Sequence, residues 1–250
     1  MTILSAFSPG DLPPIASWTP IADVGWPRRM MPAVHLSGCN FRCPYCLNRE
    51  LVAGPPDELE QIDAKELIDH FFLIGERHLM ISGAEPFMTP HLDALLSYIR
   101  FYKIRRSVAT NGFLADRIRE TAEKELVNHF VVDVKAALEP DAYSRVTGTQ
   151  MTAANIETLK ESLRFISQRM VPWTCEFRTT MCARYVSKDD LFSIAEFLGE
   201  DAIMTLQLYT THQTLAPELA DSALVIPYET LCEWGEELER IVFKVFVSEV

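Results

Sequence analysis

Short apolar runs alternate with amphipathic segments along this chain from about residue 32 onward. The apolar runs have the length of β-strands and cover residues 32–38, 78–82, 106–110, 130–135, 174–180 and 203–209, with a candidate short strand at 242–247. Between them lie segments with the spacing or composition of helices, at residues 64–74, 90–102, 114–125, 156–166, 187–198 and 231–241. Six alternating strand–helix units predict an α/β fold, with a parallel sheet and helices outside it.

Two of the predicted helices carry a start signal. Pro90 is expected in the first turn of its helix, where the missing N–H costs nothing. The run Ser187–Asp190 has the pattern of a capping box, in which the serine hydroxyl accepts from a free backbone N–H of the first turn.

The length of the chain limits its architecture. At this length a curved, partly open barrel fits better than a complete one. We expect a single domain over residues 1–250, made of an irregular lead-in (1–31), a barrel core (32–210) and a C-terminal extension (211–250). The lead-in is expected to be irregular because it is rich in proline and shows little periodicity.

Charge and hydropathy narrow the function classes. The net charge of −12 argues against electrostatic binding of DNA or RNA, which requires a basic face. No apolar run reaches the roughly 18 residues that a membrane-spanning helix needs. No basic segment followed by an apolar stretch marks a signal peptide. We therefore expect a cytoplasmic protein that binds neither nucleic acid nor membranes.

Three of the six cysteines crowd into one short loop after the first predicted strand. Cys39, Cys43 and Cys46 follow a C-x3-C-x2-C spacing, and thiolates are the ligands that iron–sulfur clusters take. Three ligands leave one iron of a [4Fe–4S] cluster open, and an open position lets a metal centre bind substrate. Two alternatives stay open: a zinc site with His35 as the nearest fourth ligand, and a redox dithiol formed by Cys43 and Cys46.

The other three cysteines are spread along the chain, at Cys175, Cys182 and Cys232. They are not grouped as a second cluster would require. We expect them to be buried free thiols.

Further polar residues follow the ends of later predicted strands. Gly83–Glu85 end the second strand, Asn111 ends the third, and Asp133 and Lys135 end the fourth. Active sites of β/α barrels lie at this carboxyl-end rim, so we expect these residues to share one site. Arg178 lies within an apolar strand, where it pairs either with a ligand carboxylate or with Glu176 or Asp133.

Five motifs, taken together in their order, resemble those of a known family. They are the cysteine loop, Ser82–Pro86, Thr110–Gly112, Asp133–Lys135 and Glu176–Thr180. They resemble the radical S-adenosylmethionine (SAM) superfamily and, within it, the activating enzymes of glycyl radical enzymes. The likeness is greatest to the activating protein of anaerobic ribonucleoside-triphosphate reductase.

This resemblance implies a partial (β/α)6 barrel, similar to an incomplete TIM barrel. It implies that Cys39, Cys43 and Cys46 hold a catalytic [4Fe–4S] cluster whose open iron binds SAM. It also implies SAM contacts from Tyr45, Ser82, Gly83, Ala84, Glu85, Thr110, Asn111, Asp133, Lys135 and Arg178. Gln207 is a further candidate for a contact to the adenine edge.

The same resemblance implies two protein partners. The chemistry needs a one-electron donor, of the flavodoxin or ferredoxin type. The hydrogen atom is then removed from a glycine of a partner glycyl radical enzyme.

Departures from the family pattern leave other functions open. Ala84, Leu47 and Ala109 replace residues that are usual in the resembled enzymes, and residues 210–226 resemble no family motif. A second hypothesis is therefore a radical SAM enzyme that modifies a small metabolite or a peptide. A third is a non-SAM redox or zinc protein that uses Cys43 and Cys46.

Overall fold

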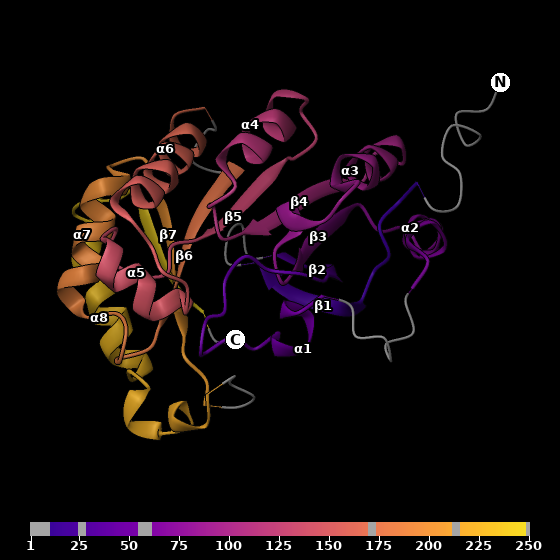
Figure 1. Cartoon of the computed structure of the whole chain (residues 1–250). Coiled ribbons are helices and arrows are strands. Elements are labelled where there is room, and N and C mark those ends of the chain that lie inside the picture. Colours follow the sequence, from indigo (N-terminus) through magenta and orange to yellow (C-terminus); the bar gives the residue numbers. More distant parts are fainter. Residues whose placement is uncertain (1–10, 25–28, 55–61, 170–173, 212–215, 249–250) are drawn as a thin grey trace.

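The computed structural model describes residues 11–24, 29–54, 62–169, 174–211 and 216–248. In this part of the chain, eight strands form one sheet in the order of the sequence (Figure 1). The strands are β1 (Ser17–Val24), β2 (Arg29–Leu36), β3 (His78–Gly83), β4 (Arg105–Thr110), β5 (His129–Asp133), β6 (Cys175–Met181), β7 (Ile203–Leu208) and β8 (Lys244–Ser248). Strand β1 runs antiparallel to β2, whereas β2 to β8 run parallel to one another.

Helices connect the parallel strands, and most of them lie along the outside of the curved sheet (Figure 1). They are α1 (Arg49–Val52), α2 (Ala64–Leu73), α3 (Leu92–Phe101), α4 (Ala115–Glu123), α5 (Pro140–Thr147), α6 (Ala153–Arg169), α7 (Lys188–Leu198) and α8 (Tyr228–Leu238). Short 3-10 turns cover Pro86–Met88, Pro217–Leu219 and Ser222–Leu224. None of the helices described is long and apolar enough to cross a bilayer. The predicted α/β fold with an incomplete barrel is confirmed.

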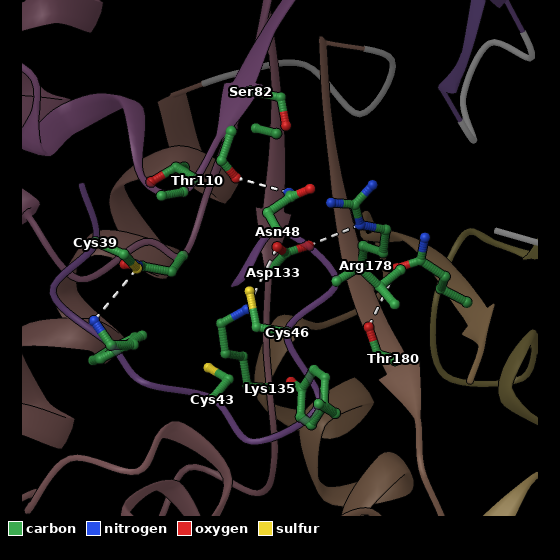
Figure 2. Close-up of a pocket in the computed structure, with 18 of the residues that line it drawn as sticks. Cys39, Cys43, Cys46, Asn48, Ser82, Thr110, Asp133, Lys135, Arg178 and Thr180 are labelled. Carbon is green, nitrogen blue, oxygen red and sulfur yellow. Dashed lines mark hydrogen bonds and ion pairs between the residues drawn. The ribbon is translucent and has the colours of Figure 1, made fainter. Parts of the chain in front are cut away.

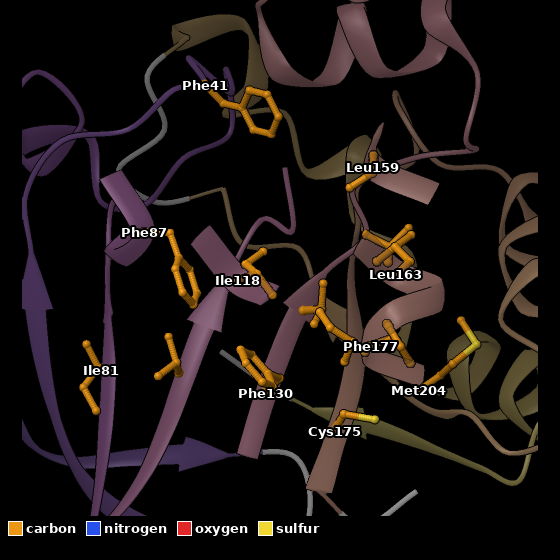
Figure 3. Packing of buried hydrophobic residues seen from close by; sticks show 14 of the residues in the cluster. Phe41, Ile81, Phe87, Ile118, Phe130, Leu159, Leu163, Cys175, Phe177 and Met204 are labelled. Atoms are coloured by element: carbon orange, nitrogen blue, oxygen red, sulfur yellow. The ribbon is translucent and has the colours of Figure 1, made fainter. Parts of the chain in front are cut away.

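Side-chain alternation along the strands separates two apolar layers. On β2, Val34 and Leu36 join the large core between the sheet and the helices, whereas Met31 and Ala33 point to the opposite, inner face. The inner layer is small and consists of Met31, Ala33, Met80, Ala109 and Val131. Figure 3 shows part of the large core, where Phe87, Phe130 and Phe177 are buried. The inner face above the small layer is thus left for polar residues.

Residues 17–24 correct the expectation of an irregular lead-in. They form β1, which pairs with β2 from Ser17 opposite His35 to Val24 opposite Arg29. The register shifts between Thr19 and Ala22, around Pro20, which has no N–H for the ladder. This irregularity hides the strand from a pattern search. The sheet also extends beyond residue 210, because β8 pairs with β7. The single-domain organisation stays a prediction.

Smaller differences concern helix and strand ends. Helix α5 has no counterpart among the predicted helices, because its two turns offer too few apolar repeats. Helix α3 begins at Leu92, so Pro90 precedes the helix instead of lying in its first turn. The capping box at Ser187 is confirmed, since Ser187 Oγ accepts from the N–H of Asp190 and the Asp190 carboxylate accepts from the N–H of Ser187. Strand β5 ends at Asp133, so Lys135 lies just beyond it.

Candidate active site

A cavity of about 450 Å³ opens at the carboxyl ends of the parallel strands. It is lined by the three cysteines of the loop after β2 and by residues at the ends of β3 to β8. The lining includes every residue predicted to contact SAM except Glu85: Tyr45, Ser82, Gly83, Ala84, Thr110, Asn111, Asp133, Lys135 and Arg178. The chain therefore brings motifs that are up to 139 residues apart, from Cys39 to Arg178 (178 − 39), around one space.

Backbone hydrogen bonds from several elements hold the cysteine loop. The N–H of Cys39 donates to the Val52 carbonyl of α1, at 3.2 Å. The N–H of Arg42 donates to the carbonyl of Thr147 at the end of α5, at 2.7 Å. The Arg42 guanidinium turns back and donates to the Cys39 carbonyl at 2.6 Å. The loop thus has a defined shape formed by the protein itself.

Gly148, which follows α5, makes this contact possible. It has a positive φ of 62°, and a Cβ placed on it would lie 2.5 Å from the Arg42 carbonyl oxygen. A residue with a side chain could not approach the loop this closely. Gly148 was not among the predicted site residues, although a glycine directly after a short helical stretch is a recognisable C-terminal signal.

All three cysteines of the loop reach the cavity. They come from one loop and line the same cavity (Figure 2). Within the described residues, no group of three or more His, Cys, Asp or Glu side chains is arranged to hold a metal ion. A cluster is larger than an ion and takes cysteine sulfurs that stand farther apart.

The charge state of the thiols also depends on a metal. Burial raises the pKa of Cys43 to about 12, although the nearby Lys135 cation acts to lower it. The thiol is therefore neutral in the protein alone. Metal coordination would deprotonate it, because the metal charge outweighs the cost of burial. The cysteine loop could therefore hold an iron–sulfur cluster, with its thiols deprotonated by the metal.

The glycine motif after β3 depends on close backbone packing. Gly83 has a φ of 122°, and a Cβ there would lie 2.1 Å from the Leu36 carbonyl oxygen. The N–H of Ala84 donates to that same carbonyl at 3.0 Å. The side-chain amide of Asn48, just after the cysteine loop, donates to the Gly83 carbonyl at 3.1 Å. The motif is therefore fixed against β2 and the cysteine loop.

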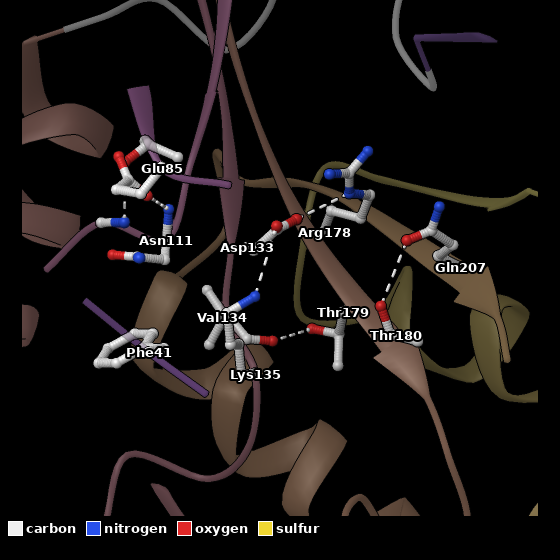
Figure 4. A network of polar contacts seen from close by, with 12 residues as sticks. Phe41, Glu85, Asn111, Asp133, Val134, Lys135, Arg178, Thr179, Thr180 and Gln207 are labelled. Atoms are coloured by element: carbon white, nitrogen blue, oxygen red, sulfur yellow. Dashed lines mark hydrogen bonds and ion pairs between the residues drawn. The ribbon is translucent and has the colours of Figure 1, made fainter. Parts of the chain in front are cut away.

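Glu85 lies behind the cavity and not in its lining. Its side chain is 1% exposed and accepts from Thr110 Oγ1 at 2.8 Å, from the N–H of Asn111 at 2.7 Å and from the N–H of Phe87 at 3.1 Å (Figure 4). Burial raises the pKa of Glu85 to about 7, against the lowering effect of these hydrogen bonds. This geometry assigns Glu85 to positioning Thr110 and Asn111. Asn111 in turn donates to the Asn40 side chain of the cysteine loop at 2.8 Å.

A carboxylate between two cations forms the opposite wall. Asp133 accepts from Arg178 Nε at 2.7 Å and pairs with Lys135 Nζ at 3.5 Å (Figures 2 and 4). Arg178 thus pairs with Asp133, one of the partners considered from the sequence. Burial acts to raise the pKa of Asp133, but the two cations outweigh it and hold this pKa below its ordinary value. The carboxylate is ionised, and it orients both cations at the edge of the cavity.

Six further polar side chains of the lining carry no charge, and two of them, Thr180 and Thr205, flank the charged Arg178. Sequence reasoning missed most of this set, which we call the uncharged zone: Thr19, His35, Thr180, Thr205, Gln207 and Ser248. They come from the two edges of the sheet, β1, β2, β6, β7 and β8. Their inward direction depends on strand register and curvature, which no local motif encodes.

The remaining predicted residues are placed as follows. Tyr45 is buried, lines the cavity and packs against Tyr185 with 5.8 Å between ring centroids. Cys175 and Cys182 are buried free thiols, as predicted, while Cys232 is only partly buried. These three cysteines lie outside the cavity lining.

Comparison with known proteins identifies the family. The Radical SAM superfamily matches residues 33–198, about two thirds of the chain. The chain belongs to the radical SAM superfamily. It is a radical SAM enzyme and uses a [4Fe–4S] cluster and S-adenosylmethionine, as this family does. Membership overturns the alternative of a non-SAM redox or zinc protein.

Individual relatives differ in how much of the chain they match. A protein named "Putative glycyl-radical enzyme activating enzyme" from Methanocaldococcus jannaschii is 21% identical over 92% of this chain and 93% of its own length. The GTP 3′,8-cyclase of Helicobacter pylori is 25% identical over 64% of this chain, which spans 48% of that protein. The chain thus spans about half the length of that cyclase.

Solved structures confirm the fold. SuiB of Streptococcus suis bound to a precursor peptide has a TM-score of 0.61 at 14% identity, over 86% of this chain and 48% of that one. TYW1 with a lysine-pyruvate adduct has a TM-score of 0.56 at 16% identity, over 84% of this chain and 72% of that one. At such identities the likeness concerns the fold alone.

Proposed function

We propose that Cys39, Cys43 and Cys46 ligate the cluster and that the residues lining the cavity between this loop and Asp133 bind SAM. When bound, the cluster and SAM supply a 5′-deoxyadenosyl radical, which accepts a hydrogen atom. The chain's own contribution is to fix the loop through α1 and α5 and to offer backbone groups at Ser82–Ala84. Lys135 and Arg178, oriented by Asp133, are available to a carboxylate or ribose. Burial keeps water from the reacting atoms.

We further propose that the hydrogen atom comes from a glycine of a partner glycyl radical enzyme. The observation that carries this proposal is the end-to-end match to the archaeal relative, which covers 92% of this chain and 93% of its own length. The cyclase relative aligns with only part of this chain and about half of its own length. An electron donor of the flavodoxin or ferredoxin type would supply the single electron.

The charges around the cavity agree with a protein substrate. Among the described lining residues, Lys135 and Arg178 are the cations, and both are already assigned to the carboxylate or ribose of SAM. A nucleoside triphosphate such as GTP would need several free cations for its phosphates. The uncharged zone offers hydroxyl, amide and imidazole groups instead, which suit the neutral amides of a peptide.

Anaerobic reconstitution tests first the proposed SAM site and then the proposed activating role. The protein loaded with iron and sulfide is expected to convert SAM to 5′-deoxyadenosine, and to generate a glycyl radical EPR doublet in a glycyl radical enzyme of the same organism. Cys43→Ala is expected to lose the cluster, whereas Cys175→Ala, which removes a buried thiol outside the cavity, keeps it. A partner that never shows the doublet, although 5′-deoxyadenosine forms, would refute the activating role.

A further inference from the structure

His35 is an imidazole in the cavity for which the SAM chemistry has no use. It lies on β2, opposite Ser82 of β3 and Ser17 of β1. It lies on the inner face of the strand, following Met31 and Ala33 at two-residue steps, and lines the cavity above that apolar layer. Its environment is therefore apolar below and open to the cavity above.

The two ring nitrogens of His35 differ in their partners. Nε2 lies 3.4 Å from the Thr19 hydroxyl of β1. Nδ1 is buried and has no hydrogen-bond partner within the part of the chain described. Burial lowers the pKa of His35, which keeps the ring neutral, with one nitrogen donating and the other accepting. Because Nδ1 has almost no accessible surface, a molecule in the cavity reaches the ring through Nε2, whose long contact with Thr19 is exposed.

A second group, which the sequence offered as a contact for the adenine edge, lies across the cavity on β7. Gln207 accepts through Oε1 from the Thr180 hydroxyl at 3.2 Å (Figure 4). This contact orients the carboxamide and leaves its nitrogen without a hydrogen bond to any described residue. His35 and Gln207 are thus two fixed, uncharged hydrogen-bonding groups on strands near opposite edges of the sheet, facing one cavity.

We propose that His35 and Gln207, oriented by Thr19 and Thr180, form a subsite that binds the main chain of the glycine-containing segment of the substrate. This inference rests on the proposed activating function and identifies the groups that recognise the segment. A peptide offers an N–H and a carbonyl at every residue, and these match one imidazole nitrogen and one carboxamide nitrogen. A phosphorylated substrate would find no described cation in the cavity lining besides Lys135 and Arg178, which are assigned to SAM.

The test uses a synthetic peptide with the sequence around the radical glycine of the same organism's anaerobic ribonucleoside-triphosphate reductase, with both glycine hydrogens replaced by deuterium. Dithionite supplies one electron for the cleavage of each SAM. One C–D bond of the glycine breaks, the deuterium atom joins the 5′ carbon, and the unpaired electron stays on the glycine Cα. Mass spectrometry of 5′-deoxyadenosine measures the transfer, and its dependence on peptide concentration gives KM.

His35→Leu is expected to raise the KM for the peptide about tenfold, the effect of one lost hydrogen bond, while the dissociation constant of SAM stays the same. His35→Gln, whose amide can reach the place of Nε2, is expected to recover part of the loss. His70→Leu removes an exposed imidazole of α2 outside the cavity and serves as the matched control, with wild-type KM. Iron content and the thermal melting temperature check that each variant folds.

Each outcome decides one claim. No deuterium in the product of the wild-type protein overturns the activating function and this subsite with it. Transfer by the wild-type protein with an unchanged KM in His35→Leu overturns the subsite alone. Weaker SAM binding in His35→Leu also overturns it, because His35 would then belong to the SAM site.

Discussion

Replacing Gly148 by alanine tests whether α5 shapes the cysteine loop. The new Cβ would lie 2.5 Å from the Arg42 carbonyl oxygen, well inside van der Waals contact. Alanine at a positive φ of 62° costs about 1–2 kcal/mol. Relieving the overlap by shifting the backbone costs about 1–3 kcal/mol more. We therefore expect the free energy of unfolding to fall by about 2–5 kcal/mol in Gly148→Ala.

Gly75→Ala is the matched control, since Gly75 also has a positive φ, of 89°, but a Cβ added there would have nothing within 4 Å. It should show only the cost of the conformation, about 1–2 kcal/mol. Urea unfolding of the metal-free proteins measures both values, and iron and sulfide analysis after reconstitution measures cluster binding. We expect Gly148→Ala alone to bind less iron, because Arg42 lies between Cys39 and Cys43, which are proposed to ligate the cluster. Equal destabilisation and equal iron content in the two variants would refute the reasoning.

Two further predictions concern buried charges. Burial raises the pKa of Glu85 from 4.5 to about 7, so the folded protein binds this proton more tightly than the unfolded chain does. The stability that comes from this proton is therefore present below pH 4.5 and is lost as the pH rises through 7. Relative to Glu85→Gln, the wild-type protein should lose about 3 kcal/mol over this range in urea unfolding, and a constant difference would contradict this. Asp133→Asn removes the ionised partner of Arg178 and Lys135 and should lower the free energy of unfolding by about 1–3 kcal/mol. An unchanged urea midpoint in Asp133→Asn would show that the two cations do not depend on this carboxylate.

The local patterns of the sequence determined much of this protein. Apolar periodicity placed the parallel strands and most helices, because burial of one face leaves a repeat in the sequence. The spacing of Cys39, Cys43 and Cys46 predicts a metal-binding loop, since three cysteines on a short loop are themselves a local feature. The rule that parallel strands end at one rim correctly brought Asn111 and Asp133 to the cavity.

Other features were decided only by the tertiary structure, because they depend on contacts between segments distant in sequence. Glu85 turns away from the cavity because Thr110 and Asn111, at the end of β4, donate to its carboxylate together with the nearby N–H of Phe87. The need for glycine at position 148 follows from the carbonyl of Arg42, which lies 106 positions earlier (148 − 42). The uncharged zone joins β1 and β2 to β6, β7 and β8 because the sheet curves. The sequence of a strand determines which side chains point to each face of the sheet. The neighbouring strands and the curvature of the sheet determine what the inner side chains face.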